Sequence, residues 1–206
     1  MLIMTQLNIE VRVIKKEPYW KSYIVQTTTP IFTPEECNII CRLGRSLPPI
    51  QAEVGGAKKG TVDTKTRISH ISWIPFGHPD AKPMYNRLKE VMYMTNKRHF
   101  NFENMELNEN AQYTEYPEGG FYNWHMDLDT DMSKEPPVRK ISMSLILSPE
   151  NEFEGGGLEI QKPGNILSPK QGHAVFFASF LNHRVIPVTM GIRKSLVMWF
   201  GGEPFK

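Results

Sequence analysis

The second half of the chain is a succession of short strand-like runs with no helical period between them. From Glu109 onward, these runs are rich in β-branched and aromatic residues and are separated by clusters of Gly, Pro and Asn. The runs are NAQYTEY, GFYNWHMD, RKISMSLIL, GGLEI, HAVFFAS, HRVIPV and IRKSLVMWF, with turns expected at YPEGG, SPENEFEGGG, KPGN and VTMG. Strands at this spacing favour a mainly β fold, either a sandwich or a jelly roll.

Two amphipathic helices are expected in the first half of the chain. The first follows Thr33, an N-cap residue, with Pro34 at the first helical position and Glu36 completing a capping box. The second falls between residues 80 and 97, where apolar residues recur with the period of a helix. Between the helices, residues 54–66 are rich in Gly, Lys and Thr and lack a hydrophobic period, which predicts a long loop serving as a lid.

The length of the chain favours a single domain over residues 1–206. Within it, residues 1–108 are expected to form mostly helical support and the lid, and residues 109–202 the jelly-roll core. The formal net charge of +2 gives no strong field for attracting nucleic acid or an acidic membrane, so neither is expected as a partner. No signal peptide or transmembrane segment is evident, so a cytoplasmic protein is expected. Cys37 and Cys41 are too few for a disulfide framework or a four-thiolate zinc site.

The stretch YNWHMDLDTD, residues 122–131, combines a histidine with aspartates. A calcium loop of the EF-hand kind starting at Asp127 would need glycine and glutamate where this chain has Met132 and Val138, so that kind of site is excluded. On a strand, His125 and Asp127 project from the same face, because side chains alternate between faces. Such a pair supplies two ligands of the facial triad of two histidines and one carboxylate that suits non-heme Fe(II).

A second histidine downstream would complete that triad, and the candidates are His173 and His183. His183 is preferred because Arg193 follows it beyond the expected turn PVTMG, where a pair of strands would return the guanidinium to the same interior. An arginine can bind a carboxylate through two parallel hydrogen bonds. His173 has no such partner in the sequence and is expected to be a structural histidine.

These residues resemble a known family, the Fe(II)- and 2-oxoglutarate-dependent dioxygenases, and in particular their prolyl 4-hydroxylase-like branch. The resemblance rests on YPEGGFYNWHMD, on RKISMSLIL followed by EFEGGGLEI, and on FFASFLNHRVIPVTMGIRKSLVMWFGG, which cover most of residues 112–202. It implies a double-stranded β-helix, a cupin-like jelly roll with supporting helices, in agreement with the pattern of strands. The first hundred or so residues resemble the helical support of such enzymes only loosely.

The resemblance implies roles for individual residues. His125, Asp127 and His183 correspond to the iron ligands of the family. Arg193 corresponds to the residue that binds the distal carboxylate of 2-oxoglutarate, and Tyr116 to a tyrosine whose hydroxyl assists there. Prolyl hydroxylases often have lysine at the position of Arg193, and arginine is the commoner choice elsewhere in the superfamily.

Three further residues, Tyr122, Arg139 and Trp199, fall where prolyl hydroxylases place residues on the substrate side. Arg139 and Trp199 fit a strand end and a core position equally well. Gly201 stands where related prolyl hydroxylases tend to carry histidine, a departure that bears on whether the substrate is peptidyl proline. Nucleic-acid demethylases of the superfamily carry a second arginine where this chain has Trp199, so that branch is set aside.

The activity implied is a hydroxylation coupled to decarboxylation of 2-oxoglutarate to succinate. It requires Fe(II), 2-oxoglutarate and dioxygen, with ascorbate as an optional addition. The leading substrate is a prolyl residue in a peptide or protein, and the alternative is a free amino acid or another small molecule. A noncatalytic jelly roll that only binds a ligand is the third hypothesis, and the combination of the triad with Arg193 argues against it. The sequence does not define an oligomeric state.

Overall fold

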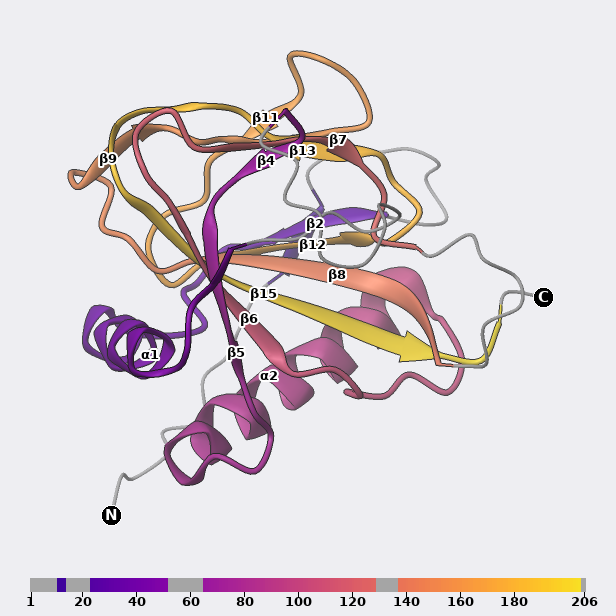
Figure 1. Cartoon of the computed structure of the whole chain (residues 1–206). Helices are drawn as coiled ribbons and strands as arrows, with labels where there is room; N and C mark the ends of the chain where they lie inside the picture. The colour runs from indigo at the N-terminus through magenta and orange to yellow at the C-terminus, as the bar shows by residue number, and fades with distance from the viewer. Residues whose placement is uncertain (1–10, 14–22, 52–64, 129–136, 205–206) are drawn as a thin grey trace.

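A computed structural model of the chain describes residues 11–13, 23–51, 65–128 and 137–204 (Figure 1). Of the predicted lid, only Lys65 and Thr66 belong to these residues, and the rest of that prediction lies outside them. Two β-sheets lie one above the other, and the helices lie on the outer side of the larger sheet (Figure 1).

The strands pair antiparallel throughout both sheets. The larger sheet has eight strands, which in spatial order are β1 (Val11–Val13), β2 (Ile24–Thr27), β12 (Ala174–Ala178), β8 (Val138–Ile146), β15 (Arg193–Gly202), β6 (Ala111–Tyr116), β5 (His70–Ile74) and β3 (Ile50–Gln51). The smaller sheet has five strands, β11 (Ile166–Leu167), β10 (Leu158–Ile160), β13 (His183–Val185), β7 (Phe121–His125) and β4 (Arg67–Ile68). A separate pair joins β14 (Val188–Gly191) to β9 (Phe153–Gly155). The predicted jelly-roll core with supporting helices is confirmed.

Both predicted helices are present. Helix α1 (Pro34–Ser46) begins with the expected capping box, in which the Glu36 backbone N–H donates to Thr33 Oγ1 and the Thr33 backbone N–H donates to Glu36 Oε2. Helix α2 (Lys82–Thr95) is preceded by a 3₁₀ turn, η1 (Pro79–Ala81), and followed by a π-helical turn, η2 (Asn96–Phe100). No helix among the described residues has the length and apolar character needed to span a bilayer.

The first half of the chain contributes more to the sheets than the sequence predicts. Strands β2, β3 and β5 extend the larger sheet and β4 extends the smaller one, in addition to the expected helices. These strands have only two to five residues, too few for an alternating pattern to stand out in the sequence. Such short strands gain their conformation from pairing with neighbouring strands, and the local sequence does not reveal that pairing.

The segment 188–191 was predicted as a turn and is instead strand β14, paired with β9 inside a stretch also predicted as a turn. The predicted hairpin between the strands of His183 and Arg193 is therefore wrong, because β13 and β15 belong to different sheets. The chain crosses from one sheet to the other through β14. Gly155 at the end of β9 and Gly191 at the end of β14 both have positive φ, a conformation that glycine adopts without steric cost.

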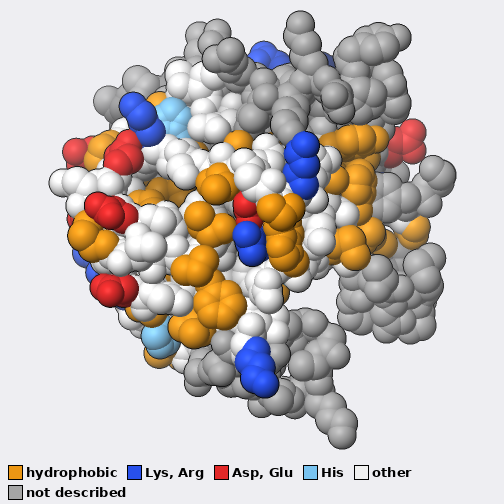
Figure 2. Space-filling view, turned by 90° about the horizontal axis from the view of Figure 1, so that it is seen from above, with side chains coloured by type: hydrophobic (Ala, Val, Ile, Leu, Met, Phe, Trp, Pro, Cys, Tyr) orange, Lys and Arg blue, Asp and Glu red, His pale blue; other side chains and the backbone are white. Residues whose placement is uncertain are grey.

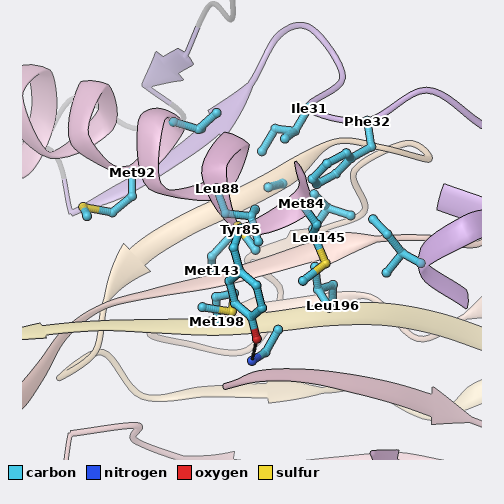
Figure 3. Packing of buried hydrophobic residues seen from close by; sticks show 14 of the residues in the cluster. Ile31, Phe32, Met84, Tyr85, Leu88, Met92, Met143, Leu145, Leu196 and Met198 are labelled. Carbon is cyan, nitrogen blue, oxygen red and sulfur yellow. Dashed lines mark hydrogen bonds between the residues drawn. The ribbon is translucent and has the colours of Figure 1, made fainter. Parts of the chain in front are cut away.

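The outer face of the larger sheet is apolar and packs on helix α2 (Figure 3). The side chains that meet there are Met143 and Leu145 of β8, Leu196 and Met198 of β15, and Met84, Leu88 and Met92 of α2. Each such side chain contributes about 1.5–3 kcal/mol when it is fully buried. The hydroxyl of Tyr85 fixes the helix on the sheet, because it donates to the Ile74 carbonyl and accepts from the Ala111 backbone N–H at 2.8 Å.

Over its middle strands, the inner face of the same sheet is polar, although it is also buried. The alternate positions of β6, β8 and β15 carry hydroxyl and amide side chains there: Gln112, Thr114, Ser142, Ser144 and Ser195. Three buried polar atoms on this face have no hydrogen-bond partner among the described residues, namely Thr114 Oγ1, Arg193 Nε and Trp199 Nε1. Buried polar atoms normally find a partner, so this concentration indicates where a ligand would bind.

Candidate functional site

Two histidines face each other on neighbouring strands of the smaller sheet. His125 at the end of β7 pairs in register with His183 at the start of β13, and directly opposed side chains of paired strands lie close together. Asp127 follows β7, and its backbone N–H donates to the Ser179 carbonyl at 3.1 Å. His183 Nε2 lies 3.4 Å from Asp127 Oδ2, and His125 Nε2 lies 3.7 Å from Asp127 Oδ1. The three side chains present one potential ligand atom each within 4.8 Å of one another.

The remaining ring nitrogens fix the orientation of both histidines. His125 Nδ1 lies 2.8 Å from the Asn123 carbonyl, and His183 Nδ1 lies 3.0 Å from the Leu181 carbonyl. A carbonyl only accepts, so each Nδ1 carries the proton and donates it. Each Nε2 is then left with its lone pair directed at the carboxylate. This second hydrogen bond is characteristic of histidines that bind metals.

The charges in the cluster suit a divalent cation. The pKa of His125 is lowered to about 3, first by burial and then by the neighbouring His183, so its ring is neutral near pH 7. Burial acts to raise the pKa of Asp127, but the neighbouring His183 and His125 and the side chains of Ser142 and Trp199 hold it below its usual range. Neutral imidazole nitrogens and one ionised carboxylate, with positions left open, are the ligands that non-heme Fe(II) takes in a facial triad.

His173 lies elsewhere, as the sequence suggests. Its Nδ1 is 3.1 Å from the Thr27 carbonyl and 3.4 Å from the Thr27 hydroxyl, at the junction of β12 with β2. Its contacts therefore tie two strands together. Of the two candidate histidines, the structure brings His183 and not His173 to His125 and Asp127.

Arg193 is a buried cation at the start of β15, with only 2% of its surface exposed. It pairs in register with Tyr116, and its guanidinium lies over that ring at 5.3 Å. Its Nη1 donates to Ser195 Oγ at 3.0 Å, and its Nε has no partner. No carboxylate among the described residues pairs with it. Burial lowers its pKa, yet a guanidinium remains protonated at neutral pH, so this cation has no anionic partner among the residues the structure describes.

Arg193 and the histidine–aspartate cluster are linked by buried side chains between the two sheets. Tyr116 belongs to the same buried cluster as Phe177 and Val185, and Tyr122 packs against that cluster. The Phe177 ring in turn meets the His183 ring edge-on at 4.6 Å. Arg193 and the potential metal ligands thus lie in the same interior region.

Tyr122 lies directly on the cluster. Its ring stacks on the His125 ring, with centroids 3.5 Å apart and planes inclined by 19°. Burial raises the pKa of Tyr122 to about 12, so its hydroxyl remains protonated and can donate a hydrogen bond. The structure places this predicted substrate-side residue beside the candidate metal site.

Arg139 and Trp199 form a layer behind Asp127. Arg139 makes an ion pair with Glu109 through both Nε, at 2.6 Å, and Nη2, and its guanidinium lies 4.0 Å above the Trp199 ring. The Trp199 Nε1–H makes no hydrogen bond of regular geometry but lies close enough to Asp127 to lower the pKa of that carboxyl. Arg139 thus already has a carboxylate partner. Its role toward a substrate stays a prediction.

Sequence reasoning missed several residues around the cluster. Ser142 Oγ lies 2.9 Å from Ser179 Oγ, next to the strand end that carries Asp127. Arg67 of β4 is buried, and its guanidinium lies 4.5 Å from the centroid of the Tyr122 ring. Serine in a strand and arginine beside a loop are common, so neither residue carries a recognisable signal in the sequence.

Comparisons with known proteins agree with this geometry. Residues 111–201 match the family model of the 2OG-Fe(II) oxygenase superfamily. A PKHD-type hydroxylase of Idiomarina loihiensis is 37% identical over 86 residues, which are 41% of this chain and 38% of that protein. The chain therefore matches well under half the length of this relative.

Solved structures share the fold over most of the chain. A prolyl-4-hydroxylase of Pseudomonas putida has a TM-score of 0.66 at 21% identity, covering 88% of this chain and 94% of that one. A prolyl hydroxylase of Trichoplax adhaerens, in complex with an oxygen degradation domain peptide fragment of hypoxia inducible factor, has a TM-score of 0.67 at 17% identity, covering 87% and 84%. Residues 111–201 are thus similar in sequence to the 2OG-Fe(II) oxygenase superfamily, and the chain has the fold of the solved prolyl 4-hydroxylases.

Proposed function

We propose that this protein is an Fe(II)- and 2-oxoglutarate-dependent hydroxylase that acts on a prolyl residue of a peptide or protein. The proposal rests on two groups near each other in the interior: a cluster of potential metal ligands and a buried cation. His125, Asp127 and His183 present a ligand set for a divalent cation, and Arg193 is a buried cation that no described carboxylate neutralises. A divalent metal would bind to the cluster, and one carboxylate of a dicarboxylate would pair with Arg193.

The residues fit these groups. His125 and His183 would bind the metal through Nε2, since each Nδ1 is engaged with a carbonyl. Arg193 would bind the distal carboxylate of 2-oxoglutarate, with Ser195 holding one side of the guanidinium and Tyr116 beneath it. When bound, the iron and 2-oxoglutarate supply the oxidising chemistry with dioxygen, releasing succinate and carbon dioxide.

The protein contributes orientation and an enclosed interior. Asp127 is held by its backbone bond to Ser179 and flanked by Ser142 and Trp199, so its carboxylate presents fixed oxygens to the metal. The buried walls from β10, β12 and β13 keep bulk water from the inner face. A charge-assisted bond to Arg193 is strong in such surroundings because the local dielectric is low.

A peptidyl substrate is supported by the prolyl hydroxylase fold and by the peptide bound in the Trichoplax adhaerens enzyme. A free amino acid or other small molecule would use the same metal and anion residues. Ascorbate dependence and a cytoplasmic location remain predictions.

The direct test is succinate formation from 2-oxoglutarate in the presence of Fe(II) and a library of proline-containing peptides, with mass spectrometry for an added oxygen atom. Free amino acids, including proline, form the second arm. We expect succinate and a hydroxylated peptide in the first arm. Hydroxylation of free amino acids alone would replace the peptidyl substrate by the small-molecule alternative.

Two histidine variants serve as a matched pair for the same assay. His183→Ala removes a proposed ligand and should abolish succinate formation, whereas His173→Ala changes a histidine outside the cluster and should retain it. If His173→Ala is inactive and His183→Ala is active, the proposed ligand set is wrong.

A further inference from the structure

The two buried arginines, Arg67 and Arg193, have no carboxylate partner among the described residues. Arg45, Arg87, Arg139 and Arg184 are all at least partly exposed, and each pairs with a glutamate. Among arginines whose side chains the structure describes, Arg67 and Arg193 are the buried ones, at 7% and 2% exposure, and neither pairs with a described carboxylate. The proposed function uses Arg193. It leaves Arg67 without a role.

Arg67 is held firmly by neutral groups. Its Nε donates to Ser69 Oγ at 2.7 Å, and its Nη2 donates to Gln112 Oε1 at 3.4 Å. Its guanidinium lies 4.5 Å from the centroid of the Tyr122 ring. These contacts fix the plane of the guanidinium and engage two of its five N–H groups, and no hydrogen bond from the others to a described residue is present.

The location of Arg67 links it to the candidate metal site. The Tyr122 ring contacts both groups: the guanidinium lies 4.5 Å from its centroid, and the His125 ring stacks on it at 3.5 Å. Strand β4 pairs with β7 so that Arg67 lies opposite Tyr122 itself, at the edge of the smaller sheet. Gln112, its other partner, lies on the polar inner face of the larger sheet. Arg67 thus reaches the interior that the substrate must enter.

A buried charge without a counterion is unfavourable, and arginine cannot lose its proton to avoid the cost. Stacking on an aromatic ring and hydrogen bonds to neutral acceptors offset only part of this cost. A carboxylate bound through two parallel hydrogen bonds would offset the rest, and it would match the planar geometry of the guanidinium.

We propose that Arg67 recognises a carboxylate carried by the substrate. This inference rests on the proposed function, and it adds the chemistry of the group next to the site of hydroxylation. Two sources supply that chemistry: the side chain of an acidic residue near the target proline in a peptide, or the α-carboxylate of a free or C-terminal residue.

The test measures binding, so that it does not depend on turnover. The protein is loaded anaerobically with Mn(II) and 2-oxoglutarate and titrated calorimetrically with two matched pairs of ligands. One pair is a blocked proline-containing peptide with glutamate or glutamine beside the proline, and the other is L-proline or its amide. We expect the carboxylate member of one pair to bind at least about tenfold more tightly, and the pair that shows the difference identifies the source.

Arg67→Gln should remove that difference while leaving the affinity of the neutral ligand and of 2-oxoglutarate within about twofold. Arg45→Gln is the control, because it removes a guanidinium whose partner is Glu115 on the outer side. Arg67→Lys keeps the charge and should retain part of the preference, which separates recognition from loss of folding.

The proposal is overturned if the wild-type protein binds both members of each pair equally, or if Arg67→Gln retains the preference. Failure of the proposed function looks different. In that case no ligand yields succinate with Fe(II) and dioxygen, whatever its affinity for Arg67.

Discussion

Gly156 lies so close to Arg193 that the two residues act as a unit. Its φ is +63°, and a Cβ added there would approach Arg193 Cδ to 2.7 Å and Val188 Cγ2 to 3.0 Å. Because β15 fixes the Arg193 backbone, the guanidinium stem would have to move aside. The proposed binding of 2-oxoglutarate by Arg193 should therefore be sensitive to a residue that has no polar side chain.

Gly156→Ala should weaken 2-oxoglutarate binding by about tenfold, equivalent to ~1.4 kcal/mol. Gly164→Ala is the control, since Gly164 also has positive φ, +85°, but nothing lies within 4 Å of an added Cβ. Both variants should lose about 1–2 kcal/mol of folding stability from backbone strain. Titration of 2-oxoglutarate into each variant checks this prediction, and equal affinities would contradict it.

Arg193 itself should affect 2-oxoglutarate more than the metal. A hydrogen bond to a charged group contributes about 1.5–3 kcal/mol, so Arg193→Ala should weaken cosubstrate affinity by roughly 10- to 150-fold. Arg193→Lys should fall between, because an ammonium keeps the charge and loses the planar fork. Titration of 2-oxoglutarate into the anaerobic Fe(II) protein measures this. Matching dissociation constants for the wild type and Arg193→Ala would remove Arg193 from the anion site.

At the scale of the element, helix α1 is anchored at its first turn. Glu36 Oε2 accepts from the Thr33 backbone N–H at 2.9 Å and from Arg87 Nη1 at 2.6 Å, and Arg87 also donates to the Ile31 carbonyl at 3.1 Å. One carboxylate thus joins the start of α1 to α2. Burial acts to raise the pKa of Glu36, but its bonds to Arg87 and Thr33 lower it overall.

The stabilisation from Glu36 should depend on pH. Since its folded pKa is below its unfolded value, its contribution is complete above the unfolded pKa and is lost as the pH falls through the folded one. Glu36→Gln should reduce the free energy of unfolding by about 1 kcal/mol at pH 7, and by less below about pH 4.3. Urea unfolding at both pH values tests this. The exposed Glu35→Gln shares the helix terminus and corrects for the helix dipole, so an equal effect would contradict the prediction.

At the scale of the whole molecule, the larger sheet separates two environments. Its outer face packs on α2 through apolar side chains, and its inner face lines the space beneath the smaller sheet (Figures 1 and 3). On the side viewed in Figure 2, acidic and basic side chains are interspersed among hydrophobic and uncharged ones. The apolar outer face therefore stabilises the fold, whereas the inner face carries Arg193 of the proposed 2-oxoglutarate site.

A metal that binds the folded state alone should raise the melting temperature. At a free concentration of 100 times the dissociation constant, Mn(II) would stabilise the fold by about 2.7 kcal/mol, which corresponds to roughly 5–10 °C for a chain of this size. His183→Ala should lose this increase. His173→Ala should keep it, although the variant starts from a lower melting temperature because its bonds to Thr27 are gone. Equal increases in both variants would contradict the triad.

Local sequence determined the parts of this protein that depend on short-range geometry. The capping box of α1 needs only Thr33, Pro34 and Glu36, because its bonds close within one turn. The alternation along RKISMSLIL predicts a strand with one buried face. The strand is present as β8, but it is buried on both faces, because the smaller sheet covers its inner side. The i, i+2 spacing of His125 and Asp127 predicts that the two side chains lie together, and they do, although Asp127 follows β7 and does not stand on the strand.

The tertiary structure alone decided which distant residues meet. His183 lies beside His125 because β13 pairs with β7, not because a hairpin carries it to Arg193. Arg67 reaches Tyr122 through a strand of two residues, too short to leave a pattern in the sequence. Register also decides which face is which, because a slip of one residue in β15 would turn Arg193 from the inner face to the apolar one. Pairing and register depend on contacts across the whole sheet, and a local pattern carries no information about them.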